Sequence, residues 1–210
     1  MAKPILHSYF RSSCTWRVRI ALAFKKIDYQ YEAVHLMKDG GEQFTQEFID
    51  LNPMKEVPVL VVGDQALHQS VAILEYLEEK YPQPALLPSD LVARAKVRAV
   101  VETITSGIQP LQNLRVLLKL KDEADRGPWA KHWIASGFIA LEEMLKRTSG
   151  KYCYGDVVTL ADVCLVPQVY NAQRFGVDLA QFPTITRINS ELLQLEAFKE
   201  SSPANMPDCQ

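Results

Sequence analysis

The chain has 210 residues, of which 48% are hydrophobic and 23% charged, so it can form one large domain or two small ones with real cores. Its formal net charge of -2, with Lys and Arg dispersed, gives no reason to expect a nucleic acid or an anionic membrane as partner. No apolar run approaches the roughly 20 residues needed to span a bilayer, and the N-terminus lacks the pattern of a secretory signal. We therefore expect a cytoplasmic protein, and the sequence leaves open whether some of it reaches mitochondria.

Short apolar runs and helical patterns alternate in the first part of the chain. Strands are predicted over residues 4–10, 29–36, 57–62 and 65–69, and helices over 14–26, 45–53 and 71–81. The first two strands and the helix between them predict a parallel βαβ unit, and Gly63 and Asp64 predict a hairpin turn. Ser70 is expected to cap the helix that follows. Residues 1–82 are thus predicted to form a small α/β domain.

A proline-rich connector follows, and after it the pattern is helical. The stretch PQPALLPSD contains three prolines, which cannot continue a helix, so residues 83–89 are predicted to be a linker. Helices are then predicted over 90–122, 129–148, 159–175 and 184–200. Pro110 and Pro167 lie inside helical patterns and should kink or break them. Residues 90–210 are therefore predicted to form an all-helical domain.

Two serines and a cysteine, Ser12, Ser13 and Cys14, stand at the start of the first predicted helix. A helix N-terminus presents unpaired backbone N–H groups and about half a unit of positive charge, so it stabilises an anion. Two roles remain open on this pattern alone. A serine can simply cap the helix, or the hydroxyls and amides can hold a thiolate that belongs to Cys14 or to a bound ligand.

A second helix N-terminus offers another anion site. Gln69 supplies an amide next to Ser70 at the start of the third predicted helix, which suits a carboxylate. Pro58 opens a strand directly after a turn, a place where a cis peptide bond can occur, although only about 5–6% of X–Pro bonds are cis. The sequence thus predicts two helix N-termini, each after a short strand, within one α/β domain.

Five long motifs resemble those of a known family. They are SSCTWRVRIALA, LNPMKEVPVL, HQSVAILEYLEEKYP, GIQPLQNL and TLADVCLVPQVYNAQRF. Together they resemble the glutathione transferases over nearly the whole chain, and more narrowly the zeta class, whose members act as maleylacetoacetate isomerase. The resemblance implies a thioredoxin-like N-terminal domain, an all-α C-terminal domain, glutathione as cofactor, a small-molecule substrate and a homodimer. Thr159 and Asp162 also match the capping box of this superfamily, a reading that the capping rule supports independently.

The resemblance implies roles for residues on both sides of a glutathione site. Ser12, Ser13 and Cys14 would surround the glutathione sulfur, with Ser12 the best candidate to donate to the thiolate. The remaining contacts would come from Gln43 at the glycyl end, Val57 before a cis Pro58, Gln69 and Ser70 at the γ-glutamyl carboxylate, and Gln109 and Arg174 at the substrate. Arg174 suits a substrate carboxylate because its planar fork binds one bidentately.

The implied activity is glutathione-dependent cis–trans isomerisation of maleylacetoacetate, with transferase activity toward α-halo acids. An alternative makes Cys14 itself the nucleophile, as in thiol transferases, although those relatives usually have proline after the cysteine and this chain has Thr15. A further alternative is a noncatalytic scaffold, against which the presence of Ser12, Gln69 and Ser70 counts.

Other chemistry-bearing residues show no grouping in the sequence. The four cysteines have no metal-ligand spacing and form no CxxC pair, and the four histidines are not clustered, so we expect free thiols and no metal. Arg11, Arg17 and Arg19 can add positive potential near the first helix. At least half of these three arginines are expected to face solvent.

Overall fold

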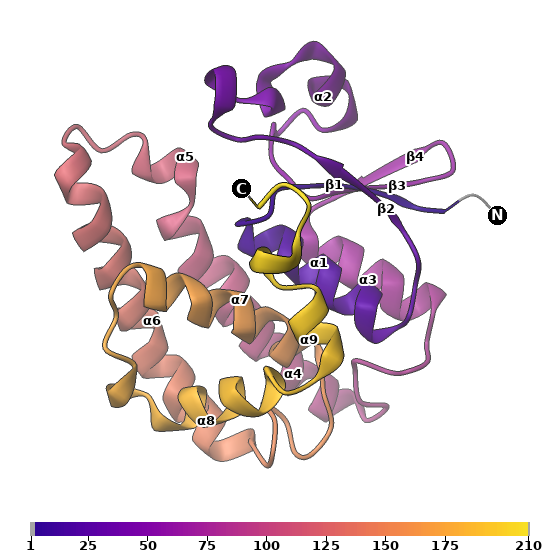
Figure 1. Ribbon diagram of the computed structural model, residues 1–210. Coiled ribbons are helices and arrows are strands. Elements are labelled where there is room, and N and C mark those ends of the chain that lie inside the picture. The colour runs from indigo at the N-terminus through magenta and orange to yellow at the C-terminus, as the bar shows by residue number, and fades with distance from the viewer. Residues whose placement is uncertain (1–2, 210) are drawn as a thin grey trace. The chain divides into compact units, whose positions relative to one another are not determined.

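The computed structural model describes residues 3–209, and their contacts divide them into two units, whose elements are labelled in Figure 1. One unit contains the described residues up to Pro84 together with those from Leu195 onward, and the other is Ala85–Gln194. This division differs from the predicted one in the C-terminal segment. That segment was expected in the helical domain, but helix α9 (Glu196–Glu200) packs against helix α1 (Ser13–Phe24) of the first unit.

A four-stranded mixed sheet forms one layer of the first unit. Its strands are β1 (Ile5–Ser8), β2 (Gln30–Ala33), β3 (Val59–Val62) and β4 (Gln65–His68), in the order β2-β1-β3-β4. β1 and β2 are parallel, and β3 runs antiparallel to both β1 and β4. The predicted βαβ unit and hairpin are therefore confirmed, with strands shorter than their apolar runs.

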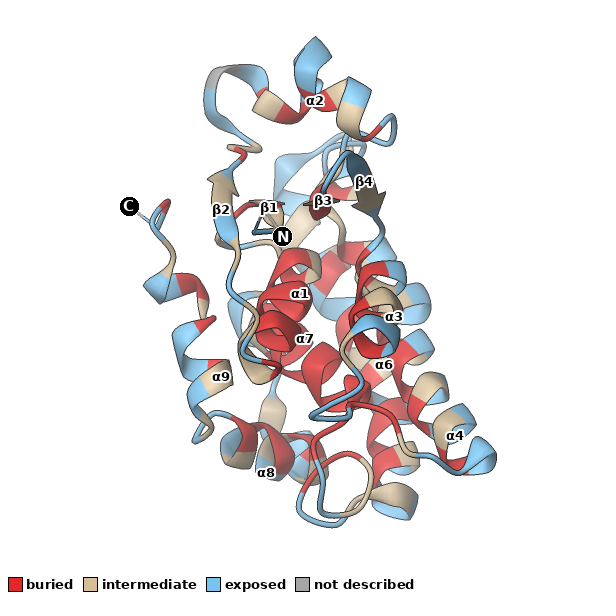
Figure 2. Ribbon diagram, turned by 90° about the vertical axis from the view of Figure 1, so that its right-hand side faces the viewer, coloured by how far each residue is buried: buried red, intermediate tan, exposed pale blue. Residues whose placement is uncertain are grey.

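Helix α1 is buried along almost its whole length. Every residue from Ser13 to Leu22 except Cys14 is buried, and Figure 2 shows this helix almost entirely in the colour of buried residues. Its neighbours include α3 (Ser70–Lys80) and α9, so few positions remain for solvent-facing side chains. The remaining helix of this unit, α2 (Gln46–Leu51), begins one residue after the Thr45 cap.

The expectation that half or more of the three N-terminal arginines face solvent is wrong. Arg11 is exposed, whereas Arg17 and Arg19 are 1% and 0% exposed. Arg17 and Arg19 are buried because α1 packs against both α3 and α9, in addition to having buried residues along almost its whole length. Burial lowers the pKa of Arg19 to about 10, so its guanidinium still carries a charge at neutral pH.

A buried ion pair joins the end of α1 to α3 and to the start of the connector. Lys25 Nζ donates to Glu78 Oε2 at 2.7 Å, and also to the carbonyl oxygens of Tyr81 at 2.7 Å and Pro84 at 2.9 Å. Three acceptors satisfy the three protons of the ammonium group, which is the condition under which a buried charge is tolerated.

The second unit is helical, apart from an isolated bridge between Ser149 and Gly155. Its α-helices are α4 (Leu91–Glu102), α5 (Leu114–Leu117), α6 (Arg126–Thr148), α7 (Leu160–Arg174) and α8 (Pro183–Leu192). Between α4 and α5 the chain passes through a π-helical segment (Thr103–Ile108) and a 3-10 turn (Gln109–Gln112). Within residues 3–209, no helix is long and apolar enough to cross a membrane.

The two helix-breaking prolines behave differently. The predicted helix over 90–122 is interrupted at the turn that contains Pro110, as expected for a residue without a backbone N–H. By contrast, α7 continues through Pro167, so this proline does not break the helix, and the kink that was the other expected outcome stays a prediction. The predicted helix over 184–200 is divided between α8 of the second unit and α9 of the first.

The predicted capping box at the start of α7 is confirmed. Asp162 Oδ2 accepts hydrogen bonds from the backbone N and the hydroxyl of Thr159, both at 2.8 Å. Its other oxygen accepts from the backbone N of Cys153 at 2.8 Å. Asp162 is 0% exposed, so one buried carboxylate satisfies the first turn of α7 and the loop that leads into it.

We expect Asp162→Ala to lower the free energy of unfolding by about 2–4 kcal/mol, because it leaves two buried backbone N–H groups without an acceptor. The matched control is Asp90→Ala: Asp90 caps α4 in the same unit but is exposed and accepts one backbone bond, from Ala93 N at 2.8 Å. Loss of that cap should cost about 1 kcal/mol. Equal losses in urea denaturation would contradict the reading of Asp162.

Candidate functional site

The N-terminus of α1 is built around Ser12. Its side-chain oxygen accepts a hydrogen bond from Thr15 N at 3.2 Å, which makes Ser12 the N-cap of the helix. This contact uses a lone pair of the hydroxyl and leaves its proton as a donor. Ser12 and Cys14 are half-buried and Ser13 is buried. The capping role and the anion-binding role, which the sequence left as alternatives, are therefore compatible in one residue.

Arg17 connects the two helix N-termini. Its Nη1 donates to Ser70 Oγ at 3.2 Å and lies 3.8 Å from Cys14 Sγ. Its Nε and Nη2 are buried and have no hydrogen-bond partner among the residues that the structure describes. The Arg17 guanidinium, two of whose nitrogens have no described acceptor, thus lies next to residues from α1 and α3. The sequence indicated Arg17 only as one of three arginines that can add positive potential, and gave it no contact in the site, although its spacing of three from Cys14 places both on one helix face.

The start of α3 differs from the prediction by one residue. Gln69 is the N-cap, and Ser70, 8% exposed, is the first helical residue. Ser70 therefore lies inside the helix and not at its N-cap, and its hydroxyl accepts from Arg17. Gln69 has φ 72° and ψ 116°, a backbone conformation that residues other than glycine rarely adopt. Such outliers occur mainly at functional sites, where they cost about 1–3 kcal/mol.

Val57 precedes a cis peptide bond to Pro58, as expected. Its side chain belongs to a buried cluster with Tyr9, Val34 and Phe48. Because β3 begins only at Val59, the main chain of Val57 lies outside the hydrogen-bonded ladder between β1 and β3. The backbone polar groups of Val57 are thus positioned by the core without being part of the sheet.

Gln43 lies in a short 3-10 helix (Glu42–Phe44) before α2 and is 6% exposed. Its Nε2 donates to Leu36 O at 3.2 Å, whereas its buried Oε1 has no partner among the side chains and main-chain groups that the structure describes. Gly41 has φ 103°, and a Cβ there would come within 2.6 Å of the Gln43 amide. The Gln43 side-chain amide is therefore fixed in place, and its Oε1 remains available to accept a hydrogen bond.

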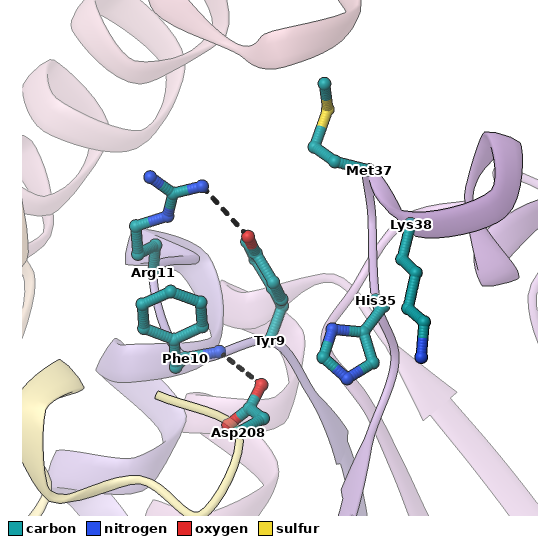
Figure 3. Close-up of a pocket in the computed structure, with 7 residues that line it drawn as sticks. All are labelled: Tyr9, Phe10, Arg11, His35, Met37, Lys38 and Asp208. Atoms are coloured by element: carbon teal, nitrogen blue, oxygen red, sulfur yellow. Dashed lines mark hydrogen bonds between the residues drawn. The ribbon is translucent and has the colours of Figure 1, made fainter. Parts of the chain in front are cut away.

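A cavity of about 340 Å³ lies in the first unit, beside the end of β1 (Figure 3). It is bounded by Tyr9, Phe10, Arg11, His35, Met37, Lys38 and Asp208. Arg11 is oriented by a hydrogen bond from its Nη2 to the Tyr9 hydroxyl at 3.0 Å. The cavity combines two cationic side chains with one carboxylate, and Arg11 immediately precedes Ser12.

The two predicted substrate residues belong to the second unit. Gln109 is half-buried and follows the π-helical segment, a type of irregularity that often occurs at functional sites. Arg174 is the last residue of α7, is exposed, and lies with its guanidinium carbon 5.1 Å from the centre of the Phe175 ring. Their role toward a ligand of the first unit stays a prediction.

The cysteines and histidines form no further site in the described part of the chain. All four cysteines are free thiols, and no group of three or more His, Cys, Asp or Glu side chains that the structure describes can hold a metal ion. Burial raises the pKa of the Cys153 thiol well above its usual range, so this thiol is unreactive. Cys14 is the one half-buried cysteine and stands at a helix N-terminus.

Comparisons of this chain with known proteins all point to the same family. Residues 11–80 match the family described as "Glutathione S-transferase, N-terminal domain". The chain is 59% identical over 206 residues to maleylacetoacetate isomerase of Rattus norvegicus, with 98% of this chain and 95% of the relative covered. The fold expected from the sequence, a thioredoxin-like domain with an all-α domain, is the fold of that family.

Solved structures support the same grouping. A maleylacetoacetate isomerase from Anaeromyxobacter dehalogenans with glutathione bound in its active site is 45% identical, with a TM-score of 0.90 and 99% and 98% of the two chains covered. A bacterial maleyl pyruvate isomerase of the zeta class is 43% identical, with a TM-score of 0.94 and 98% and 100% of the chains covered.

The conformation of Gln69 generates a prediction about stability. Gln69→Gly should raise the free energy of unfolding by about 0.5–2 kcal/mol, because glycine adopts φ 72° without steric cost. Gln65→Gly in the neighbouring strand β4 is the control, and it should lower the same free energy by about 0.5–1 kcal/mol. Urea denaturation measures both, and destabilisation by Gln69→Gly would show that the backbone there is unstrained.

Proposed function

Since this chain belongs to the zeta-class glutathione transferases and maleylacetoacetate isomerases, we propose that it isomerises maleylacetoacetate to fumarylacetoacetate with glutathione as cofactor. This reaction is a step of tyrosine and phenylalanine catabolism, and the same site transfers glutathione to α-halo acids. The observation that carries the proposal is the junction of two helix N-termini through Arg17. That junction places a buried positive charge beside Cys14 and Ser70. Such a charge would stabilise the negative charges of bound glutathione, its thiolate and its carboxylate.

The residues present fit glutathione at both ends. Ser70 and Gln69 would take the γ-glutamyl carboxylate, and the spare donors of Arg17 supply charge to that corner. The backbone of Val57 would pair with the cysteinyl unit. At the other end the unpartnered Oε1 of Gln43 is an acceptor, so it suits the N–H of the glycyl unit better than its carboxylate.

Ser12 would hold the sulfur. Its hydroxyl proton is available to donate to a thiolate because the cap uses a lone pair, and the helix N-terminus adds positive potential. Ser13 and Cys14 would complete the wall around the sulfur. These contacts favour the charged form of the thiol and so lower its pKa.

When bound, glutathione would supply a thiolate that adds to the conjugated double bond of the substrate. Addition turns that double bond into a single bond, the substrate rotates about it, and the thiolate then leaves. The chain itself must bind the carboxylates of the substrate and stabilise negative charge that develops on the conjugated carbonyl. Arg174 and Gln109 are the proposed groups for this task, Arg174 as a bidentate partner of a carboxylate.

A specific contact favours one competing function. Cys14 is half-buried at a helix N-terminus with the Arg17 guanidinium 3.8 Å from its sulfur, which is a suitable environment for a reactive cysteine. In that alternative Cys14 forms a mixed disulfide with glutathione and the protein is a thiol transferase.

We also propose that the protein is a homodimer in the cytoplasm. Family membership supports both statements, and each unit exposes large apolar side chains that a partner subunit would cover. Phe44 and Met54 are 58% and 48% exposed in the first unit, and Leu91 and Val92 are 79% and 62% exposed in the second.

The identity of the nucleophile can be tested with Cys14→Ala. If the attacking sulfur belongs to glutathione, this variant should keep at least about a tenth of the isomerase turnover, because it removes only a neighbour of the sulfur. Omission of glutathione should abolish isomerisation by the unmutated protein. Loss of turnover in Cys14→Ala, with fold and glutathione affinity intact, would favour the thiol transferase. Absence of glutathione-dependent isomerisation in the unmutated protein would refute the proposed function.

The substrate carboxylate provides a second test. Arg174→Ala should raise KM for maleylacetoacetate about ten- to a hundredfold, the equivalent of about 1.5–3 kcal/mol for a hydrogen bond to a charged group. Arg174→Lys should recover only part of this loss, because it keeps the charge without the fork. Turnover of a neutral electrophile should change little. Equal damage with charged and neutral substrates would show that Arg174 has a structural role.

A further inference from the structure

The C-terminal segment is attached to α1 through two buried side chains. Trp16 Nε1 donates to Ser201 Oγ at 3.2 Å, and Arg19 Nε donates to Ser201 O at 3.0 Å. Both Trp16 and Arg19 are buried, so these bonds are protected from water. The path of the segment is therefore set at Ser201, seven residues before Asp208.

Asp208 makes a second, separate attachment. Its Oδ2 accepts a hydrogen bond from Phe10 N at 2.9 Å, and its Oδ1 accepts one from the Tyr31 hydroxyl at 2.6 Å. Asp208 is 9% exposed, so both carboxylate oxygens are used in a largely dry place. Burial and the bond to Asp208 raise the pKa of Tyr31, which keeps this phenol a neutral donor.

Phe10 is held from both sides of its main chain. Its N–H donates to Asp208, and its carbonyl accepts from Arg19 Nη2 at 3.0 Å. The preceding carbonyl, that of Tyr9, accepts from Ser12 N at 2.9 Å. Asp208 and Arg19, which carry opposite charges, thus both hydrogen-bond the main chain of Phe10. They hold the loop between β1 and α1 two residues before Ser12. Figure 3 shows the Asp208 carboxylate directed at the Phe10 nitrogen.

We propose that Asp208 is a positioning residue that fixes the loop between β1 and α1, so that the Ser12 hydroxyl is held in place for the reacting sulfur. The inference rests on the proposed function. Because Ser201 already anchors the segment, the bond to Phe10 is not needed to attach it, and its effect falls on the loop.

Three variants and a control separate the bond to Phe10 from general anchoring. Asp208→Ala removes the bonds to both Phe10 and Tyr31, Tyr31→Phe removes only the bond to Tyr31, and Asp208→Asn keeps an acceptor for Phe10 N. Cys209→Ser changes an exposed neighbour on the same segment. The readouts are kcat and KM for glutathione-dependent isomerisation, and amide hydrogen exchange at Phe10 in the unliganded protein.

We expect Asp208→Ala to lower kcat about tenfold or more, because small displacements of reacting groups are costly, while KM changes less than kcat. The Phe10 amide should exchange at least about tenfold faster in this variant, since it loses its acceptor. Asp208→Asn, Tyr31→Phe and Cys209→Ser should each keep kcat within about threefold of the unmutated value.

Unchanged kcat or unchanged Phe10 exchange in Asp208→Ala would overturn the inference. So would an equal loss of kcat in Tyr31→Phe, which would show that anchoring of the segment matters and the bond to Phe10 does not. If Asp208→Ala does not fold, a tenfold loss in Asp208→Asn still refutes it. Failure of the proposed function is distinguished by the unmutated protein, which would then show no isomerisation, whereas the exchange measurement at Phe10 needs no substrate.

Discussion

Two arginines buried along one helix must find their partners inside the protein, and much of the first unit is arranged to provide them. Arg17 and Arg19 are two residues apart on α1 and are almost fully buried. Arg19 donates to the loop before the helix and to the C-terminal segment, and Arg17 donates to the start of α3. Since an uncompensated buried charge costs several kcal/mol, these contacts fix how α1 meets its neighbours.

The same arrangement explains how the first unit suits an anion. Arg17 keeps donors that no described residue accepts, and it lies where the first turns of α1 and α3 meet. Ser12 caps α1 with a lone pair and retains a proton, and Ser70 accepts from Arg17 rather than capping α3. A bound carboxylate or thiolate would supply acceptors for these donors.

Local patterns predicted the elements, and long-range contacts decided the rest. The hairpin at Gly63 and the capping box at Thr159 depend on neighbours within a few residues, and both were predictable. The burial of Arg19 was not, because its partners include Ser201, 182 residues away. The bond from Phe10 to Asp208 spans 198 residues and joins a segment that the sequence assigned to the helical domain.

The candidate site likewise contains residues that the sequence could identify and residues that only the fold identifies. Ser12 at a helix start can be read from the sequence, and the resemblance to the family pointed to Val57 and Gln43. The spacing of three residues places Arg17 on the helix face of Cys14, but the sequence does not show that its guanidinium is buried and reaches Ser70 of α3. The N-cap of α3 lies one residue before the predicted one, and the Ser70 hydroxyl accepts a hydrogen bond from Arg17 of α1, a contact that the local pattern does not contain.

We propose that the N-terminus of α1, through Ser12, holds the sulfur of glutathione as a thiolate. The direct measurement is the pKa of bound glutathione, followed by the ultraviolet absorbance of the thiolate across a pH series in the unmutated protein and in Ser12→Ala. We expect a pKa at least one unit below the value of about 8.5 for an ordinary cysteine thiol, and a rise toward that value in Ser12→Ala. A bound thiol that titrates like an ordinary one, or an equally low pKa in both proteins, would contradict it.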